Sequence, residues 1–127
     1  MPNTAITNIQ AVLNTAVTST GTLCTADTAD LAEVFDITLT KSAGKAYIEI
    51  FNSAAVGTVT FSLAAGTGYG GSAVALTGSV LQATSKLIQV DDAKYKTGGV
   101  MTLTVTPSAG AKLKTGNIVY VKVGQLV

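Results

Sequence analysis

The chain has 127 residues, a formal net charge of +1 and 47% hydrophobic residues, with one cysteine, no histidine and no tryptophan. This length suits one domain, and the 20 Thr, 18 Ala, 14 Val and 13 Gly favour β-structure. Without histidine there is no Ser-His-Asp or Cys-His nucleophile, and all eight basic residues are lysine, so no arginine can bind phosphate. The composition argues against an enzyme, and with no basic block it also argues against binding to nucleic acid or a membrane surface.

The N-terminus lacks the features of a secretory signal, because Met1 to Ile6 contains neither a positive region nor an apolar one. We therefore expect synthesis in a cytoplasm. The single Cys24 agrees with this expectation, since it has no partner cysteine within the chain. Its neighbours supply no cation that would lower the pKa of the thiol, so Cys24 is interpreted as a buried small hydrophobe.

Residues 1–33 are predicted to form an N-terminal arm. Many threonines make this stretch a poor helix, yet it carries an apolar stripe that includes Ile6, Ile9, Leu13 and Val17. Such a stripe either packs back on its own domain or lies across a neighbouring subunit.

Charge is unevenly distributed along the chain. Residues 1–40 carry four acids and no lysine, a net charge of −4, whereas residues 86–127 carry six lysines against Asp91 and Asp92, a net charge of +4. The two regions are either solvated faces that meet in the fold or complementary ends of copies in an assembly.

From Val34 onward, apolar and polar residues alternate with the period of a β-strand. The first two strands, over 35–39 and 46–50, are separated by a short turn with Gly44 and are predicted to form a hairpin, and a third follows over 57–63. Short apolar pieces on either side of Gly78, and strands over 86–90, 100–106 and 117–123, complete the pattern. The last of these has apolar residues on both faces, which indicates a central strand or one covered by a partner.

These strands, joined by short turns and by no convincing helix, predict an all-β domain over residues 34–127. The expected architecture is an antiparallel β-sandwich or a jelly-roll-like barrel with the N-terminal arm attached.

A glycine-rich motif, Gly66-Thr67-Gly68-Tyr69-Gly70-Gly71, matches the G-x-G-x-x-G pattern of dinucleotide-binding loops, and Asp91 lies 20 residues beyond Gly71. Such a site needs a helix after the motif, but Gly78 interrupts the candidate segment. We interpret the motif as a flexible connection between strands, with Tyr69 at its tip as a residue that contacts a partner.

Carboxylates offer no better site. Asp27, Asp30 and Glu33 could share a calcium ion, but their spacing lacks the glycine of a calcium loop. Asp91 and Asp92 would point to opposite faces of a strand. The sequence therefore predicts no catalytic residue, no metal site and no cofactor.

Several β-strand and turn segments from about Thr28 to the C-terminus resemble small proteins encoded beside the major capsid protein in tailed bacteriophages and prophages. The segments are 32–35, 57–66, 76–80, 88–91, 93–96 and 103–107. The resemblance implies a head decoration, or cement, protein: a β-rich virion subunit, often a homotrimer, that binds the outside of the capsid and clamps the major capsid protein.

On this interpretation the partner-binding residues are Ile6, Ile9, Leu13, Val17 and Tyr69. The alternative is an adhesive or carbohydrate-binding β-sandwich on a cell or phage-tail surface. Modules of that class usually stack sugars on exposed aromatic residues, and this chain argues against the alternative because it has only seven aromatic residues and no tryptophan.

Overall fold

The structure, a computed structural model, describes residues 3–10, 16–17, 21–24, 32–39, 45–53, 57–67, 74–91, 94–107 and 119–125. Within these ranges the chain forms eleven strands: β1 (Thr4–Thr7), β2 (Ile9–Gln10), β3 (Thr22–Leu23), β4 (Glu33–Thr38), β5 (Lys45–Asn52), β6 (Val59–Leu63), β7 (Leu76–Val80), β8 (Thr84–Asp91), β9 (Lys96–Thr97), β10 (Val100–Pro107) and β11 (Val119–Gln125).

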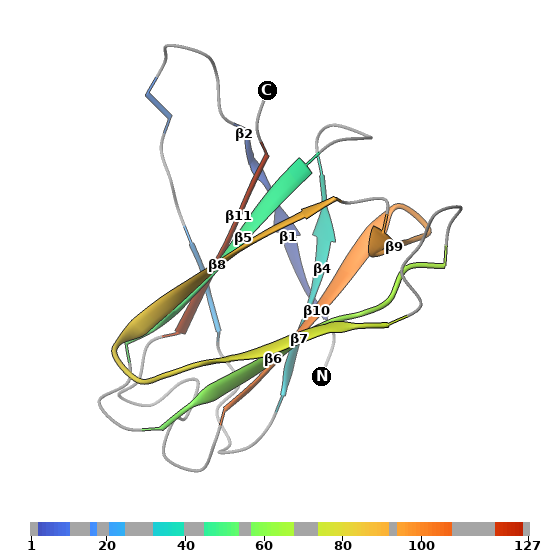
Figure 1. The fold of residues 1–127 in the computed structure, drawn as a ribbon. Helices are drawn as coiled ribbons and strands as arrows, with labels where there is room; N and C mark the ends of the chain where they lie inside the picture. Colours follow the sequence, from blue (N-terminus) through green and yellow to red (C-terminus); the bar gives the residue numbers. More distant parts are fainter. Residues whose placement is uncertain are drawn as a thin grey trace.

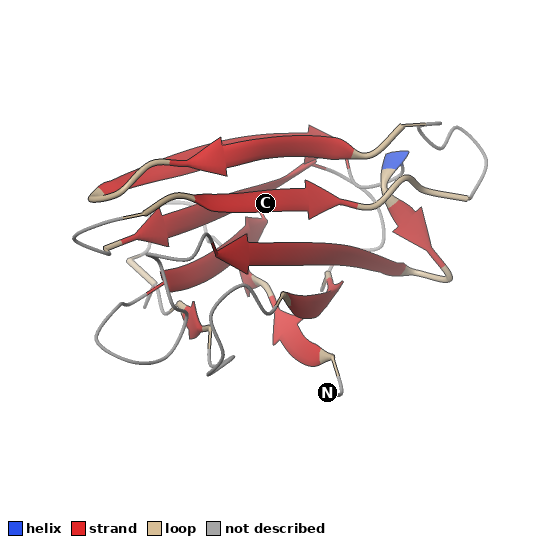
Figure 2. Cartoon of the chain, turned by 90° about the horizontal axis from the view of Figure 1, so that it is seen from below, coloured by secondary structure: helices blue, strands red, loops and turns tan. Residues whose placement is uncertain are grey.

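The strands form two sheets that pack against each other. Sheet A has the order β1-β4-β10-β6-β7 with β9 beside β10, and sheet B has the order β2-β11-β5-β8 with β3 beside β11. All pairings are antiparallel except β1 with β4 and β2 with β11. Figure 1 shows β11, β5 and β8 side by side, facing β4, β10 and β6. Strands dominate the described chain in Figure 2. The predicted all-β antiparallel sandwich is confirmed.

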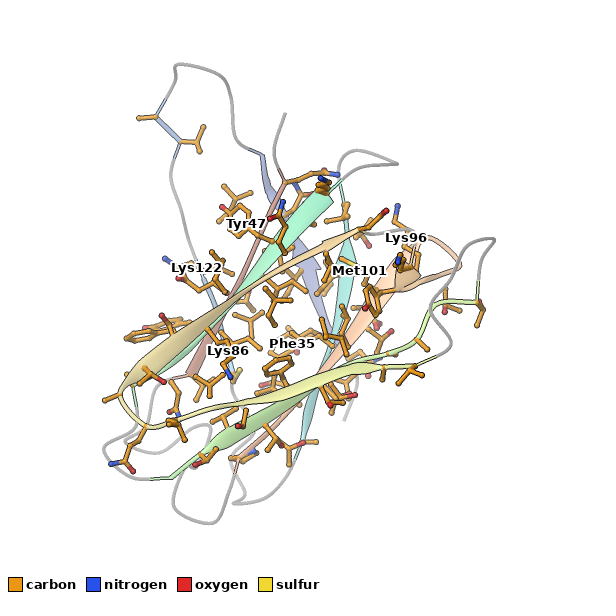
Figure 3. All side chains as sticks on the ribbon, viewed as in Figure 1. Phe35, Tyr47, Lys86, Lys96, Met101 and Lys122 are labelled. Atoms are coloured by element: carbon orange, nitrogen blue, oxygen red, sulfur yellow. The ribbon has the colours of Figure 1, made fainter. Side chains whose placement is uncertain are left out.

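The core lies between the sheets and is supplied by alternate residues of each strand. Phe35 and Met101 of sheet A, both fully buried, lie between the layers in Figure 3. Burial of such a side chain contributes about 1.5–3 kcal/mol to the free energy of unfolding. Because many alternate positions are buried in this way, the period-two alternation of apolar residues is the main determinant of the fold. The other buried hydrophobic residues are Ile6, Cys24, Ile37, Leu39, Ala46, Ile48, Ile50, Val59, Phe61, Leu63, Val80, Val90, Leu103, Val105, Val119, Val121 and Val123.

The N-terminal residues do not form a separate arm. β1 pairs with β4 in sheet A, and β2 pairs with β11 in sheet B, so residues 3–10 pass from one sheet to the other. Asn8, which lies between the two strands, is buried, and Ile6 is aligned with Ile37 and only 5% exposed. Ile6, the first residue of the predicted apolar stripe, therefore packs in the core of its own sandwich, whereas Val17 at the other end of the stripe is 42% exposed.

The predicted hairpin over 35–50 is wrong in its pairing, although both strands exist. β4 lies in sheet A and pairs with β10, whereas β5 lies in sheet B and pairs with β11 and β8. Alternation identifies the buried face of each strand but does not identify its neighbour. The two inner faces oppose each other across the core instead of lying side by side.

The connection between β7 and β8 joins the two sheets at one edge. The backbone N–H of Thr84 donates to the carbonyl of Leu81 at 3.2 Å, and Ala83 adopts a positive φ of 58° in this turn. Gly78, predicted to separate two short apolar pieces, lies inside β7 instead. A Cβ there would be 2.6 Å from the ring of Phe61, so the ring covers the glycine.

Candidate interaction surface

Of the three acidic residues considered from the sequence and set aside as a calcium site, Glu33 is the one that the structure describes. Glu33 is buried, and its Oε1 accepts a hydrogen bond from Thr4 Oγ1 at 3.1 Å. Asp27 and Asp30 lie outside the described residues. No group of three or more potential metal ligands occurs within the described ranges.

Cys24 is fully buried, as the sequence predicts for a small hydrophobe. Its backbone N–H donates to the carbonyl of Val119 at 2.9 Å. Burial raises the pKa of the thiol, and the nearby Glu33 carboxylate raises it further. The thiol is therefore held neutral and is a poor nucleophile.

The raised pKa of Cys24 predicts an alkaline loss of stability. The unfolded thiol ionises near its ordinary pKa of 9.0, whereas the folded thiol stays protonated, so stability is retained below that pH and falls as the pH rises above it. The free energy of unfolding should drop by about 1.4 kcal/mol per pH unit from this group alone. Urea titrations at several alkaline pH values should show a smaller drop for Cys24→Ala than for the native chain. Parallel curves would contradict the assignment.

The described part of the glycine-rich motif has a packing role. The backbone N–H of Gly66 donates to the carbonyl of Lys94 at 3.0 Å, and that of Thr67 donates to the carbonyl of Lys96 at 3.1 Å. The segment beyond the motif forms strands β7 and β8, so the helix that a dinucleotide site requires is not formed there. Residues 68–73, including Tyr69, lie outside the described residues.

Gly66 allows two backbone segments to approach closely. A Cβ at this position would lie 2.5 Å from the carbonyl oxygen of Lys94, which is backbone and cannot rotate away. We expect Gly66→Ala to lower the free energy of unfolding by about 1–3 kcal/mol, the usual range for overpacking. Chemical denaturation measures this loss, and Ala64→Gly, at an exposed position of the same segment, is the control. Equal stabilities for Gly66→Ala and the native chain would show that the contact can relax.

Of the five residues predicted to bind a partner, the structure describes Ile6, Ile9 and Val17, and these three differ in burial. Ile6 is in the core, which corrects its assignment, and Ile9 is half-buried in β2. Val17 is 42% exposed. Leu13 and Tyr69 lie outside the described residues. Val17 is thus the described member of this set that offers exposed apolar surface.

The outer face of sheet A is polar. The Asp36 carboxylate accepts hydrogen bonds from Asn3 Nδ2, at 3.1 Å to each oxygen, and from Thr102 Oγ1 at 3.5 Å. Across the middle of this face the outward positions carry hydroxyl groups: Thr60, Ser62, Thr77, Ser79, Thr102, Thr104 and Thr106. Thr60 Oγ1 donates to the carbonyl of Thr106 at 3.3 Å, and a face that carries hydroxyl groups suits contact with water.

The outer face of sheet B is different, because it carries aromatic and aliphatic side chains. Phe51 is 41% exposed and lies directly opposite Tyr120 of β11, while Leu87 of β8 is 66% exposed and lies opposite Glu49. Of the large exposed hydrophobic residues in the described ranges, Phe51 and Leu87 are the two that lie on strands. Exposed apolar residues on a rigid sheet mark a contact surface.

Tyr47 extends this face toward the start of β5. Its ring covers Gly124 of β11, where a Cβ would lie 2.0 Å from the ring. Figure 3 shows Tyr47 and Lys122 on the outer side of sheet B, away from the core. A large side chain over a strand glycine pins the register of the two strands, so the face is preorganised.

The sequence contains a signal for this surface. Tyr47 and Phe51 occupy the outward positions of the second predicted strand, and Tyr120 and Lys122 those of the last one. The last strand was predicted to be either central or covered by a partner, and it is central. β11 has β5 on one side and both β2 and β3 on the other.

Comparison with known proteins leaves the family open: no family model, no curated protein and no solved structure matches this chain. Within the described ranges, no helix has the length and apolar character to cross a membrane.

Proposed function

We propose that this chain is a structural virion protein, a decoration or cement subunit that binds the outer surface of a phage capsid and stabilises it without catalysis. The observation that carries the proposal is that large apolar side chains stay exposed at two separate places, Phe51 and Leu87 on sheet B and Val17 outside the strands, so the subunit can make more than one contact. Sheet A presents hydroxyl groups, whereas sheet B presents Phe51 and Leu87 on a rigid support. A protein that works by binding other proteins needs exposed apolar surface of this kind. The resemblance of its strands and turns to phage decoration proteins implies that the partner is the major capsid protein.

The capsid contact in this proposal lies around Val17. Its side chain is 42% exposed and lies outside the strands of both sheets, so it is available to a partner without disturbing the core. Binding across neighbouring subunits of the major capsid protein stabilises a shell by mass action, because the bound form is favoured over separated subunits. This requires no cofactor and no chemistry.

Shell binding tests the proposed function directly. Shells assembled from the major capsid protein of the phage or prophage that carries this chain should co-sediment with it and melt at a higher temperature when it is bound. Val17→Asp should weaken co-sedimentation, whereas Thr104→Ser, on the outer face of sheet A, should not. Failure of the native chain to co-sediment with these shells would overturn the proposal.

A carbohydrate-binding or adhesive module is the second candidate. The observation in its favour is that Tyr47, Phe51 and Tyr120 lie on one sheet face, where sugar rings can stack on aromatic side chains. Calorimetric titration with a panel of oligosaccharides decides between the two. Saturable binding that is lost in Phe51→Ala, together with no shell binding, would favour this second function.

A further inference from the structure

We propose that two copies of this chain pack face to face through the outer face of sheet B, related by a two-fold axis that runs parallel to the strands between β5 and β11. The inference rests on the proposed function in one respect, namely that the protein works by binding other protein subunits and not by catalysis. It adds the occupant of the sheet B surface, a second copy of the chain. The resemblance implies a trimer, so the proposed symmetry is a distinct and testable claim.

The cross-strand register makes this face self-complementary. Phe51 is aligned with Tyr120, and Glu49 is aligned with Lys122. A two-fold rotation about the proposed axis exchanges the positions of β5 and β11. Phe51 then faces Tyr120 of the partner subunit, and Glu49 faces Lys122 of the partner subunit. Each aromatic residue meets an aromatic residue and each charge meets its opposite, and both pairs occur twice, as an isologous interface requires.

The shape of the face fits the same rotation. Leu87 lies one strand beyond Glu49, on β8, and at 66% exposed it is more exposed than Phe51, the other large exposed hydrophobic residue on the strands of sheet B, which is 41% exposed. On the opposite side of β11, Gly21 lies beside Lys122, since a Cβ on Gly21 would be 3.2 Å from Lys122 Cγ. The rotation places Leu87 over Gly21 of the partner subunit, so a protruding side chain meets a position that has none.

The charges of the face permit this contact. Its outward positions include Lys45 and Asp91, which are aligned with each other, as well as Glu49 and Lys122. The two positive and two negative groups balance, so two copies do not repel each other. Face-to-face sheets pack about 10 Å apart with their strands within about 30°, a spacing that aromatic and leucine side chains fill.

Two copies could also associate by pairing their edge strands β8, but the edge of sheet B disfavours this arrangement. Lys86 is aligned with the core residue Ile50, so it occupies an inward position of the edge strand, and it is exposed there. Figure 3 places Lys86 on the side of β8 that faces the core. An inward-pointing charge on an edge strand hinders the addition of another strand, because that strand would cover the charge.

Sedimentation equilibrium over a range of concentrations tests the dimer. The native chain should form a reversible dimer, and Leu87→Asp should weaken dimerisation by at least about tenfold, because it replaces an apolar side chain that packs on Gly21 of the partner subunit with a charge. Thr104→Asp, on the outer face of sheet A, should leave it unchanged. A native chain that stays monomeric, or forms a trimer that Leu87→Asp does not weaken, would overturn the proposal.

A mixing experiment separates contacts between copies from contacts within one copy. Glu49→Lys and Lys122→Glu should each weaken the dimer, because each places like charges across the interface. An equimolar mixture of the two variants should form heterodimers, in which lysines of one copy face glutamates of the other. Mixing cannot repair contacts inside either chain, so a mixture as weak as the separate variants would contradict the two-fold arrangement.

The two proposals fail in different ways. A monomeric chain that still co-sediments with capsid shells would overturn the dimer and leave the decoration function standing. A dimer that follows the mixing rule but binds no shell would overturn the decoration function alone.

Discussion

Deletion of residues 1–10 should abolish cooperative folding and not simply release a tethered arm. The deletion removes β1 and β2, one strand from each sheet, and exposes the backbone edges of β4 and β11. It also removes Ile6, which is 5% exposed in the core. Substitution of a buried isoleucine by alanine costs about 2–5 kcal/mol, and a domain has only about 5–15 kcal/mol of stability in total. Thermal unfolding followed by circular dichroism in the far ultraviolet measures the loss.

Point variants keep this test informative if the truncated chain cannot be purified. Ile6→Ala should lower the free energy of unfolding by about 2–4 kcal/mol, because it leaves a cavity beside Ile37. Val17→Ala, at a position that is 42% exposed, should change it by no more than about 0.5 kcal/mol. A truncated chain that melts as cooperatively and at the same temperature as the native chain would show that the N-terminal strands are dispensable.

The fold class could be predicted from the sequence because burial follows the alternation of residues. The alternation over 100–106 puts the apolar residues Met101, Leu103 and Val105 on one face, and all three are fully buried. The pairing of strands could not be predicted, because it depends on which faces meet in space. β4 and β5 illustrate this point: their inner faces were identified correctly, yet the strands belong to different sheets.

The same dependence on strand pairing explains why residues 3–10 were predicted to belong to an N-terminal arm although they form strands of the sandwich. Ile6 and Ile9 were recognised as apolar, but β1 and β2 are short and are separated by Asn8, so neither shows a strand pattern by itself. Each strand is stabilised by a longer neighbour, β4 or β11, that is distant in the sequence. Tertiary contacts decide such segments, and a local pattern does not contain them.

The sheet B surface was present in the sequence only in parts. Phe51 and Tyr120 are 69 positions apart, and only the pairing of β5 with β11 brings them together. Their outward positions could be read from the alternation, but their proximity could not. An interaction surface built from several strands is therefore harder to recognise than a contiguous motif, and the glycine-rich motif at Gly66 was the more conspicuous and less informative signal.

Replacement of Asn52 should be strongly destabilising. Asn52 continues the inward positions of Ile48 and Ile50 at the end of β5, beyond the strand that the sequence predicts over 46–50. It is fully buried, and its Nδ2 donates to the carbonyl of Val80 at 3.2 Å and to that of Gly57 at 3.4 Å. Because Val80 ends β7 of sheet A, this side chain ties sheet B to sheet A.

Asn52→Ala should lower the free energy of unfolding by about 2–4 kcal/mol, since each buried carbonyl that loses its donor costs about 1–3 kcal/mol. Asn52→Leu keeps the volume of the side chain but not the donor, so it should recover little of this loss. Urea denaturation compares the three chains. A leucine variant as stable as the native chain would show that the position needs volume and not a hydrogen-bond donor.

Asn52→Asp adds a pH dependence that identifies the donor role. An ionised carboxylate cannot donate to the carbonyls of Val80 and Gly57, and its burial raises the pKa of the introduced group above the unfolded value of about 3.9. The folded chain therefore keeps a proton that the unfolded chain releases. The deficit of this variant relative to the native chain should be smallest below about pH 4 and should grow by up to about 1.4 kcal/mol per pH unit as the pH rises toward the folded pKa. A deficit that is independent of pH would place the carboxylate in water, and the tie between β5 and β7 would then not depend on a proton at this position.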